Sequence, residues 1–173
     1  MATAVATRTI GTLNIDQVTR APRRLSKSVR LEAGQKKVFD FIRQHENWTR
    51  WFPILKAVSV DNSQAQSAGG NNCIRHCTLV NGVQFSEKIV GYDPPNQFGY
   101  AIEDDNPLGV QGHLAVVTVE AEAGGGSILR WHQYFDHPQA ETFVQEVNQI
   151  LDGGIQSLLE RFGGESLETV FHE

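Results

Sequence analysis

The sequence predicts an α+β fold in which a curved, seven-stranded antiparallel sheet is followed by one long C-terminal helix. Two observations predict this class. Short segments that alternate between apolar and polar residues follow one another from residue 55 to residue 136, separated by turns rich in Gly, Asn and Pro. After Pro138 the apolar residues change to helical spacing and keep it as far as Phe162. A chain of 173 residues with 40% apolar content fits one such domain.

The first elements are a strand and two short helices. Alternation from Ser26 to Ala33 predicts the strand, and the change to helical spacing over Gln35–Arg43 predicts the first helix. A second short helix is expected through Trp48–Trp51, because Pro53 prevents its continuation. The remaining strands follow these three elements.

Six further strands complete the expected sheet, and turn residues separate them. They cover Leu55–Asp61, Cys73–Val80, Val83–Tyr92, Gln97–Glu103, His113–Ala121 and Ser127–Asp136. This spacing is typical of an antiparallel meander.

The Asn81-Gly82 turn leaves two registers open for the strands on either side. A two-residue loop places His76 beside Glu87, whereas a three-residue loop with Gly82 in the left-handed conformation places Arg75 opposite Glu87. We favour the second register, because the first would bury Glu87 with only a histidine near it.

The chain is expected to divide into three parts. Residues 1–25 contain one acid and no sustained periodicity, which predicts a mobile arm; an ordered extension that packs on the domain or on a partner is the alternative. Residues 26–164 form the folded domain, and residues 165–173 form an acidic tail. Within the final helix we expect a break at Gly153-Gly154, where small residues leave room for a ligand.

Composition excludes several classes of partner. A net charge of −5 and the lack of a Lys/Arg cluster argue against nucleic-acid binding, and no apolar stretch is long enough for an integral membrane segment. The two cysteines, Cys73 and Cys77, lie too far apart along one strand to form a disulfide, and His76 points to the opposite face, so no metal site is expected. Reduced thiols indicate a cytoplasmic location.

Scattered residues resemble one known superfamily. They are Val38-Phe39-Asp40-Phe41-Ile42, Trp48-Thr49-Arg50-Trp51-Phe52-Pro53, Arg75, Glu87, Tyr92-Asp93-Pro94-Pro95, Tyr100, Trp131 and Phe135. Over about residues 26 to 163 the chain is similar to START-like, helix-grip (SRPBCC) proteins, and within them to the polyketide cyclase/dehydrase and lipid-transport group. The resemblance implies a deep cavity between sheet and C-terminal helix. Relatives bind lipids, hormones, quinone-like or aromatic polyketide molecules, and only some are enzymes. The chain lacks the iron–sulfur ligands of ring-hydroxylating relatives, and no cofactor is expected.

Strand parity selects the side chains that face this cavity, because alternate residues of a strand share a face. The expected ligand-binding residues are Arg75, Phe85, Glu87, Phe98, Tyr100, His113, Trp131, Gln133 and Gly154. Trp48, Trp51 and Phe52 either cap the entrance or simply pack the short helices, and residues 107–110 form either a lid or an ordinary connection.

Three functions remain open at this point. The first is a carrier or sensor of one small hydrophobic molecule, lipid-like, isoprenoid or aromatic. The alternative is an enzyme of the polyketide cyclase/dehydratase type, with His113 or Glu87 as the base and Arg75 or Tyr100 stabilising an enolate, although Arg75 and Glu87 equally suit a structural ion pair. The third is an interaction module that uses its N-terminal arm either to form a homodimer or to dock to a larger assembly.

Overall fold

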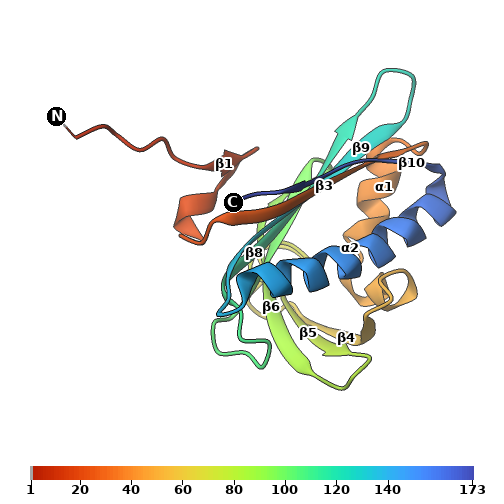
Figure 1. The fold of residues 1–173 in the computed structure, drawn as a ribbon. Helices are drawn as coiled ribbons and strands as arrows, with labels where there is room; N and C mark the ends of the chain where they lie inside the picture. Colours follow the sequence, from red (N-terminus) through yellow and green to blue (C-terminus); the bar gives the residue numbers. More distant parts are fainter. Residues whose placement is uncertain (1) are drawn as a thin grey trace.

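In the computed structural model, which describes residues 2–173, one large antiparallel sheet curves beside a long helix, α2 (Ala140–Phe162), that lies across one of its faces (Figure 1). The sheet has eight strands in the order β10-β3-β9-β8-β7-β6-β5-β4. They are β3 (Arg23–Leu31), β4 (Leu55–Asp61), β5 (Ile74–Leu79), β6 (Gln84–Asp93), β7 (Gln97–Ile102), β8 (Gln111–Ala121), β9 (Ser127–Asp136) and β10 (Gly164–Phe171). The α+β class is thereby confirmed, with one strand more in this sheet than the sequence predicts.

The additional strand, β10, replaces the expected acidic tail. After α2 the chain turns at Gly163-Gly164, whose positive φ angles of 70° and 132° suit glycine, and then pairs antiparallel with β3 from Gly164↔Leu31 to Phe171↔Leu25. Seven of its eight residues are exposed, so the strand carries no alternating apolar pattern that a reader of the sequence could detect. Its position is set by backbone pairing at the edge of the sheet.

The N-terminal arm is also ordered for most of its length. It contains a small hairpin, β1 (Thr9–Ile10) and β2 (Leu13–Asn14), and a 3-10 turn, η1 (Ile15–Gln17). Ile15 is fully buried against apolar side chains that β8 and β9 present on the face of the sheet opposite α2. The structure therefore differs from the expected mobile arm and agrees with the alternative of an extension packed on the domain.

Helix α1 (Gln35–Ile42) and the 3-10 helix η2 (His45–Arg50) connect β3 to β4, in the expected order. Helix α2 differs from the prediction, because it continues through Gly153-Gly154 without a break. A Cβ atom on Gly154 would lie 2.5 Å from Cδ2 of Phe52, so this glycine allows the helix to approach the Phe52 ring closely. The small residues bring α2 and the chain after η2 together and do not leave space between them.

The β5–β6 hairpin adopts the favoured register, in which Arg75 lies opposite Glu87. Gly82 has φ of 86° and its N–H donates to the Leu79 carbonyl at 2.9 Å, while Leu79 N–H donates to the Val83 carbonyl at 2.8 Å. This three-residue loop places both charged side chains on the face of the sheet that α2 covers.

Aromatic side chains fill one part of the space between sheet and helix. The Trp48 ring meets those of Phe52, Phe98, Tyr100 and Trp131 with centroids 5.4 to 6.2 Å apart. Such edge-on arrangements are favourable for aromatic rings and leave few rotamers open. The cluster fixes the walls of the cavity described next. Among residues 2–173, no helix has the length and apolar character required to span a membrane.

Candidate functional site

A cavity of about 310 Å³ lies between the sheet and α2, beside the aromatic cluster. Most of its lining is apolar, and four polar side chains from neighbouring strands gather with a tyrosine on the sheet side. The lining residues are Trp48, Phe52, Ile54, Leu55, Arg75, Leu79, Asn81, Phe85, Glu87, Tyr100, Ile102, Leu108, His113, Gln133, Phe143, Glu146, Val147, Ile150 and Leu151. An apolar chamber with a few polar groups is the usual form of a small-molecule site.

Arg75 and Glu87 form a buried ion pair in the wall of this cavity. Arg75 Nε donates to Glu87 Oε2 at 2.8 Å, and Nη2 donates to the same oxygen. Their side chains are only 2% and 7% exposed. Burial opposes the charge on Arg75, but the adjacent Glu87 carboxylate outweighs it and raises the pKa of the guanidinium. Each charge therefore compensates the other inside an apolar region.

Aromatic rings enclose the guanidinium on two sides. Cζ of Arg75 lies 4.3 Å from the centroid of the Trp48 ring and 4.5 Å from that of Tyr100. The Tyr100 hydroxyl in turn accepts a hydrogen bond from Trp131 Nε1 at 2.9 Å. Burial, followed by the nearby Glu87 charge, raises the pKa of Tyr100, so this phenol stays protonated. The arrangement holds Arg75 rigidly and keeps Tyr100 neutral.

His113 and Gln133 form the second polar pair. Nε2 of His113 lies 3.0 Å from Oε1 of Gln133, and the Ile102 backbone N–H donates to Nδ1 of His113 at 3.3 Å. Burial lowers the pKa of His113 to about 4, so the ring is neutral at physiological pH. Because both ring nitrogens already have partners, His113 has no free lone pair with which to accept a proton from a ligand.

The structure brings most of the sequence-predicted residues to this cavity. Those that line it are Arg75, Phe85, Glu87, Tyr100, His113 and Gln133. Phe98 and Trp131 face the same side of the sheet but lie outside the lining, because Trp48 packs against both rings. Gly154 also lies outside the lining, since α2 contacts Phe52 at that point. The prediction that Phe98, Trp131 and Gly154 line the cavity is therefore corrected.

Several lining residues come from segments that strand parity does not address. Phe143, Val147 and Ile150 belong to the apolar face of α2. In the sequence, their three- and four-residue spacing indicates this face. Leu108 reaches the cavity from the β7–β8 loop. Its backbone carbonyl oxygen lies 3.1 Å from His137 Nε2. Trp48 lines the wall, whereas Trp51 is buried outside it.

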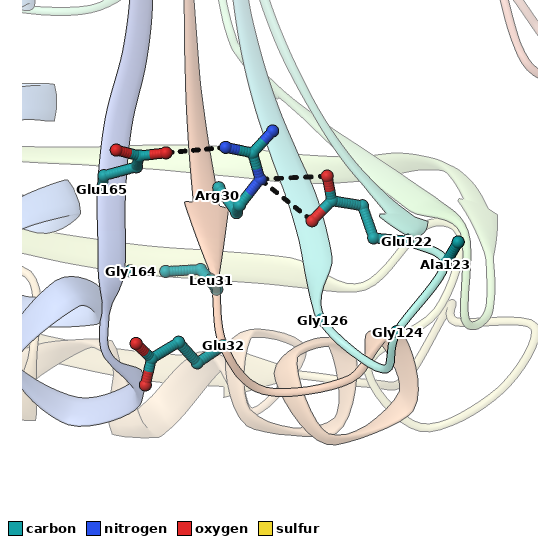
Figure 2. Close-up of a pocket in the computed structure, with 9 residues that line it drawn as sticks. All are labelled: Arg30, Leu31, Glu32, Glu122, Ala123, Gly124, Gly126, Gly164 and Glu165. Carbon is teal, nitrogen blue, oxygen red and sulfur yellow. Dashed lines mark hydrogen bonds and ion pairs between the residues drawn. The ribbon is translucent and has the colours of Figure 1, made fainter.

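A second depression opens where β3, β10 and the β8–β9 loop meet, and charged side chains line part of it. Figure 2 shows Arg30 between two carboxylates, with Nε 3.0 Å from Glu122 Oε1 and Nη1 2.7 Å from Glu165 Oε1. Hydrogen bonding to Glu122, more than to Glu165, raises the pKa of Arg30. The cation is thus already paired, and these contacts fasten the edge strand β10 to β3. We regard this depression as structural.

The described residues contain no cluster of three or more His, Cys, Asp or Glu side chains arranged to hold a metal ion. Cys73 and Cys77 are buried and free. The Cys77 thiol lies 3.7 Å from Glu87 Oε2, and burial raises the pKa of that thiol. It remains a protonated thiol that donates weakly to the carboxylate.

Comparison with known proteins gives one family match and many structural matches. The model of the family described as polyketide cyclase / dehydrase and lipid transport matches residues 22–166. A search of curated proteins found no match. The XoxI protein of Bacillus cereus has a TM-score of 0.68 at 17% identity, over 79% of this chain and 93% of the other.

Two further solved structures are similar. A START superfamily protein from Mycobacterium smegmatis has a TM-score of 0.63 at 10% identity, over 81% of this chain and 99% of its own. Norcoclaurine synthase from Thalictrum flavum, in complex with dopamine and hydroxybenzaldehyde, has a TM-score of 0.62 at 13% identity, over 92% of this chain and 95% of its own. At such low identities the likeness establishes the fold and no more.

Proposed function

Because the chain belongs to the polyketide cyclase / dehydrase and lipid transport family, we propose that its cavity binds one small, largely apolar molecule that the protein carries or senses. The observation that carries this proposal is the cavity itself, walled mostly by apolar side chains, with Arg75, Glu87, His113 and Gln133 on its sheet side. Burial of the ligand's apolar surface would drive binding, at about 25 cal/mol per Å² before the entropic costs. The polar groups would orient it.

The size of the cavity limits the ligand. A volume of about 310 Å³ lies at the small end of the range for ligand sites, roughly 300 to 1,000 Å³. A compact aromatic or isoprenoid molecule of one or two rings fits this space better than a lipid with two acyl chains. Aromatic side chains such as Trp48 and Phe143 would provide flat contact surfaces for such rings.

Native mass spectrometry of the gently purified full chain tests the proposal, followed by extraction and identification of anything that copurifies. We expect a bound apolar molecule of this size. Titration with small aromatic compounds follows if the protein is purified empty. Failure to bind any of them would contradict a binding function.

Catalysis by proton abstraction is the second candidate, and one observation favours Glu87 over His113 as its base. Both ring nitrogens of His113 are engaged, whereas all hydrogen bonds to Glu87 fall on Oε2, which leaves Oε1 without one among residues 2–173. Glu87 would take a proton from the carbon beside a ligand carbonyl, and a nearby donor would stabilise the enolate.

Deuterium exchange separates the two candidates. With 2-acetonaphthone in D₂O, an enzyme of this type would replace the methyl protons by deuterium, and Glu87→Gln would abolish the acceleration. A carrier or sensor would bind the ketone without accelerating exchange beyond the rate in buffer. Proton nuclear magnetic resonance measures both rates directly.

A further inference from the structure

His113 lies between two hydrogen bonds whose directions fix its tautomer. The Ile102 N–H can only donate, so His113 Nδ1, 3.3 Å away, carries no proton. The proton of the neutral ring is then on Nε2 and is donated to Gln133 Oε1 at 3.0 Å. The depressed pKa of His113, about 4, is consistent with this neutral form.

The orientation of Gln133 follows from that of His113. Since the carbonyl oxygen of the amide accepts from His113, its Nε2 is directed elsewhere. The Gln133 side chain also lies at the Tyr100 hydroxyl, where its hydrogen bonding opposes the rise in the pKa of that phenol. An amide nitrogen carries two N–H groups, so at least one remains for a ligand in the cavity that Gln133 lines.

Glu87 offers the complementary acceptor. Its Oε2 accepts hydrogen bonds from Arg75 and from the Cys77 thiol. Oε1 accepts none from the described residues, and it is not fully buried. Both residues line the same cavity from neighbouring rows of the sheet. Glu87 pairs with Ile102, the residue whose N–H donates to His113, and Gln133 lies in the next row, with Ile89, Tyr100 and Ala115.

The polar end of the cavity has no net charge. Arg75 and Glu87 neutralise each other, and His113, Gln133 and Tyr100 are uncharged. A charged ligand group placed there would lose its hydration without gaining a free counter-charge, which is costly. Exposed Glu146, at the α2 side of the cavity, adds repulsion for an anion.

We infer that this site recognises an uncharged ligand whose polar end carries a hydrogen-bond acceptor and a donor on the same or adjacent carbon atoms. Gln133 Nε2 donates to the ligand carbonyl, Glu87 Oε1 accepts from its N–H or O–H, and His113 is the positioning residue that keeps the Gln133 donor turned toward the ligand. Amides, hydroxy ketones and enolised diketones have this pattern. The inference rests on the proposed binding function and specifies its ligand class.

Four naphthalene probes of similar size test the inference by isothermal titration calorimetry on the full chain. They are naphthalene, 2-acetonaphthone, 2-naphthamide and 2-naphthoate. We expect 2-naphthamide to bind about tenfold more tightly than naphthalene, because its two hydrogen bonds outweigh the desolvation of the amide. The ketone should fall between them, and the carboxylate should bind at least about tenfold more weakly than the amide.

Variants separate the positioning role from packing. In Gln133→Met the ratio of the naphthamide and naphthalene affinities should fall to about threefold or less, since the donor is lost at similar volume while Glu87 Oε1 is retained. His113→Leu should reduce the same ratio, because the amide can then turn over. His113→Gln retains a donor for Gln133 Oε1, so this variant should keep most of the affinity ratio of the parent protein. If His113→Leu does not fold, Gln133→Met and His113→Gln still test whether the Gln133 donor contacts the ligand.

The outcomes distinguish this inference from the function on which it rests. Failure of all four probes to bind would overturn the proposed function and the inference together. Binding of naphthalene with no preference for the amide would overturn only the inference. Tightest binding by 2-naphthoate would also overturn it, because the site would then recognise an anion. An unchanged affinity ratio in His113→Leu would remove His113 from its positioning role.

Discussion

Arg75 and Glu87 lie directly opposite each other on β5 and β6, and every hydrogen bond between them converges on a single oxygen, Glu87 Oε2. The pair is almost completely buried, and the guanidinium is further enclosed by Trp48 and Tyr100. The two oxygens of Glu87 therefore differ. Oε2 compensates the buried cation, while Oε1 accepts no hydrogen bond from residues 2–173.

The pair should be strongly coupled in a double-mutant cycle. Arg75→Met leaves an unpaired buried carboxylate and should lower the free energy of unfolding by about 3–5 kcal/mol, whereas Arg75→Met combined with Glu87→Leu should cost less than the sum of the single changes. Chemical denaturation measures each value. The exposed cross-strand pair Arg130–Glu120, 2.6 Å apart, is the control and should give no more than about 1 kcal/mol. Additive effects at Arg75 and Glu87 would contradict the coupling.

Strand parity predicted the polar face of the cavity for a simple physical reason. A strand has a period of two residues, so once the turn at Gly82 fixes the register, Arg75 and Glu87 must share a face. Parity gives the face of a residue but not its depth. Phe98 and Trp131 point to the predicted side, yet Trp48 from a distant short helix covers them.

The parts that the sequence did not predict depend on tertiary partners. Ile15 belongs to a segment without regular periodicity, and its burial arises only because β8 and β9 expose apolar residues toward it. Strand β10 is mostly exposed and is held by backbone pairing and by the Arg30–Glu165 contact. The Gly153-Gly154 pair looked like a helix break because glycine is a poor helix former, but packing against Phe52 and Pro53 overrides that preference.

The two adjacent glycines of α2 should respond oppositely to alanine. In Gly154→Ala the new Cβ would lie 2.5 Å from Phe52 Cδ2, in a ring held by other aromatics, so we expect a loss of about 1–3 kcal/mol. In Gly153→Ala the nearest atom is Pro53 Cγ at 3.5 Å, an ordinary contact, and better helix propensity should stabilise the protein by about 0.5–1 kcal/mol. Thermal unfolding of both variants shows whether each substitution stabilises or destabilises the protein. Equal shifts would refute the close-packing account.

Ile15 should contribute to stability as a core residue does. It is fully buried with Leu114, Val116 and Tyr134 on the outer face of the sheet, so Ile15→Ala should cost about 2–4 kcal/mol. Val5, which is 93% exposed, provides the control, and Val5→Ala should leave the unfolding free energy within about 0.5 kcal/mol. An unchanged melting temperature for Ile15→Ala would mean that the arm is mobile in solution after all.

Buried histidines should make the protein less stable in acid. Burial lowers the pKa of His45 to about 3 and those of His113 and His132 to about 4, all below the ordinary histidine value of 6.5. Between these values the unfolded chain binds protons that the folded chain does not, so stability is full above pH 6.5 and decreases as pH falls toward 4. Each histidine contributes a slope of up to about 1.4 kcal/mol per pH unit.

Substitution separates this effect from the titration of carboxylates. Denaturant titrations at several pH values should show a shallower dependence in His113→Gln than in the parent protein, because one proton-binding group of the unfolded state is removed. If His113→Gln reproduces the pH dependence of the parent protein, the His113 ring is not held neutral by burial.

Filling the cavity from α2 should abolish binding without unfolding the protein. Val147 lines the cavity and is partly exposed, so the larger indole of Val147→Trp can occupy much of a space of about 310 Å³ at a modest cost in packing. Gln145→Trp, on the exposed side of the same helix, adds the same group outside the cavity. We expect the affinity for 2-acetonaphthone to fall at least about tenfold in Val147→Trp and to stay unchanged in Gln145→Trp. Circular dichroism verifies that both variants are folded. Both variants carry the same indole on one helix, so a loss of binding in both would indicate a surface effect. Only a loss confined to Val147→Trp assigns the ligand to the space between α2 and the sheet.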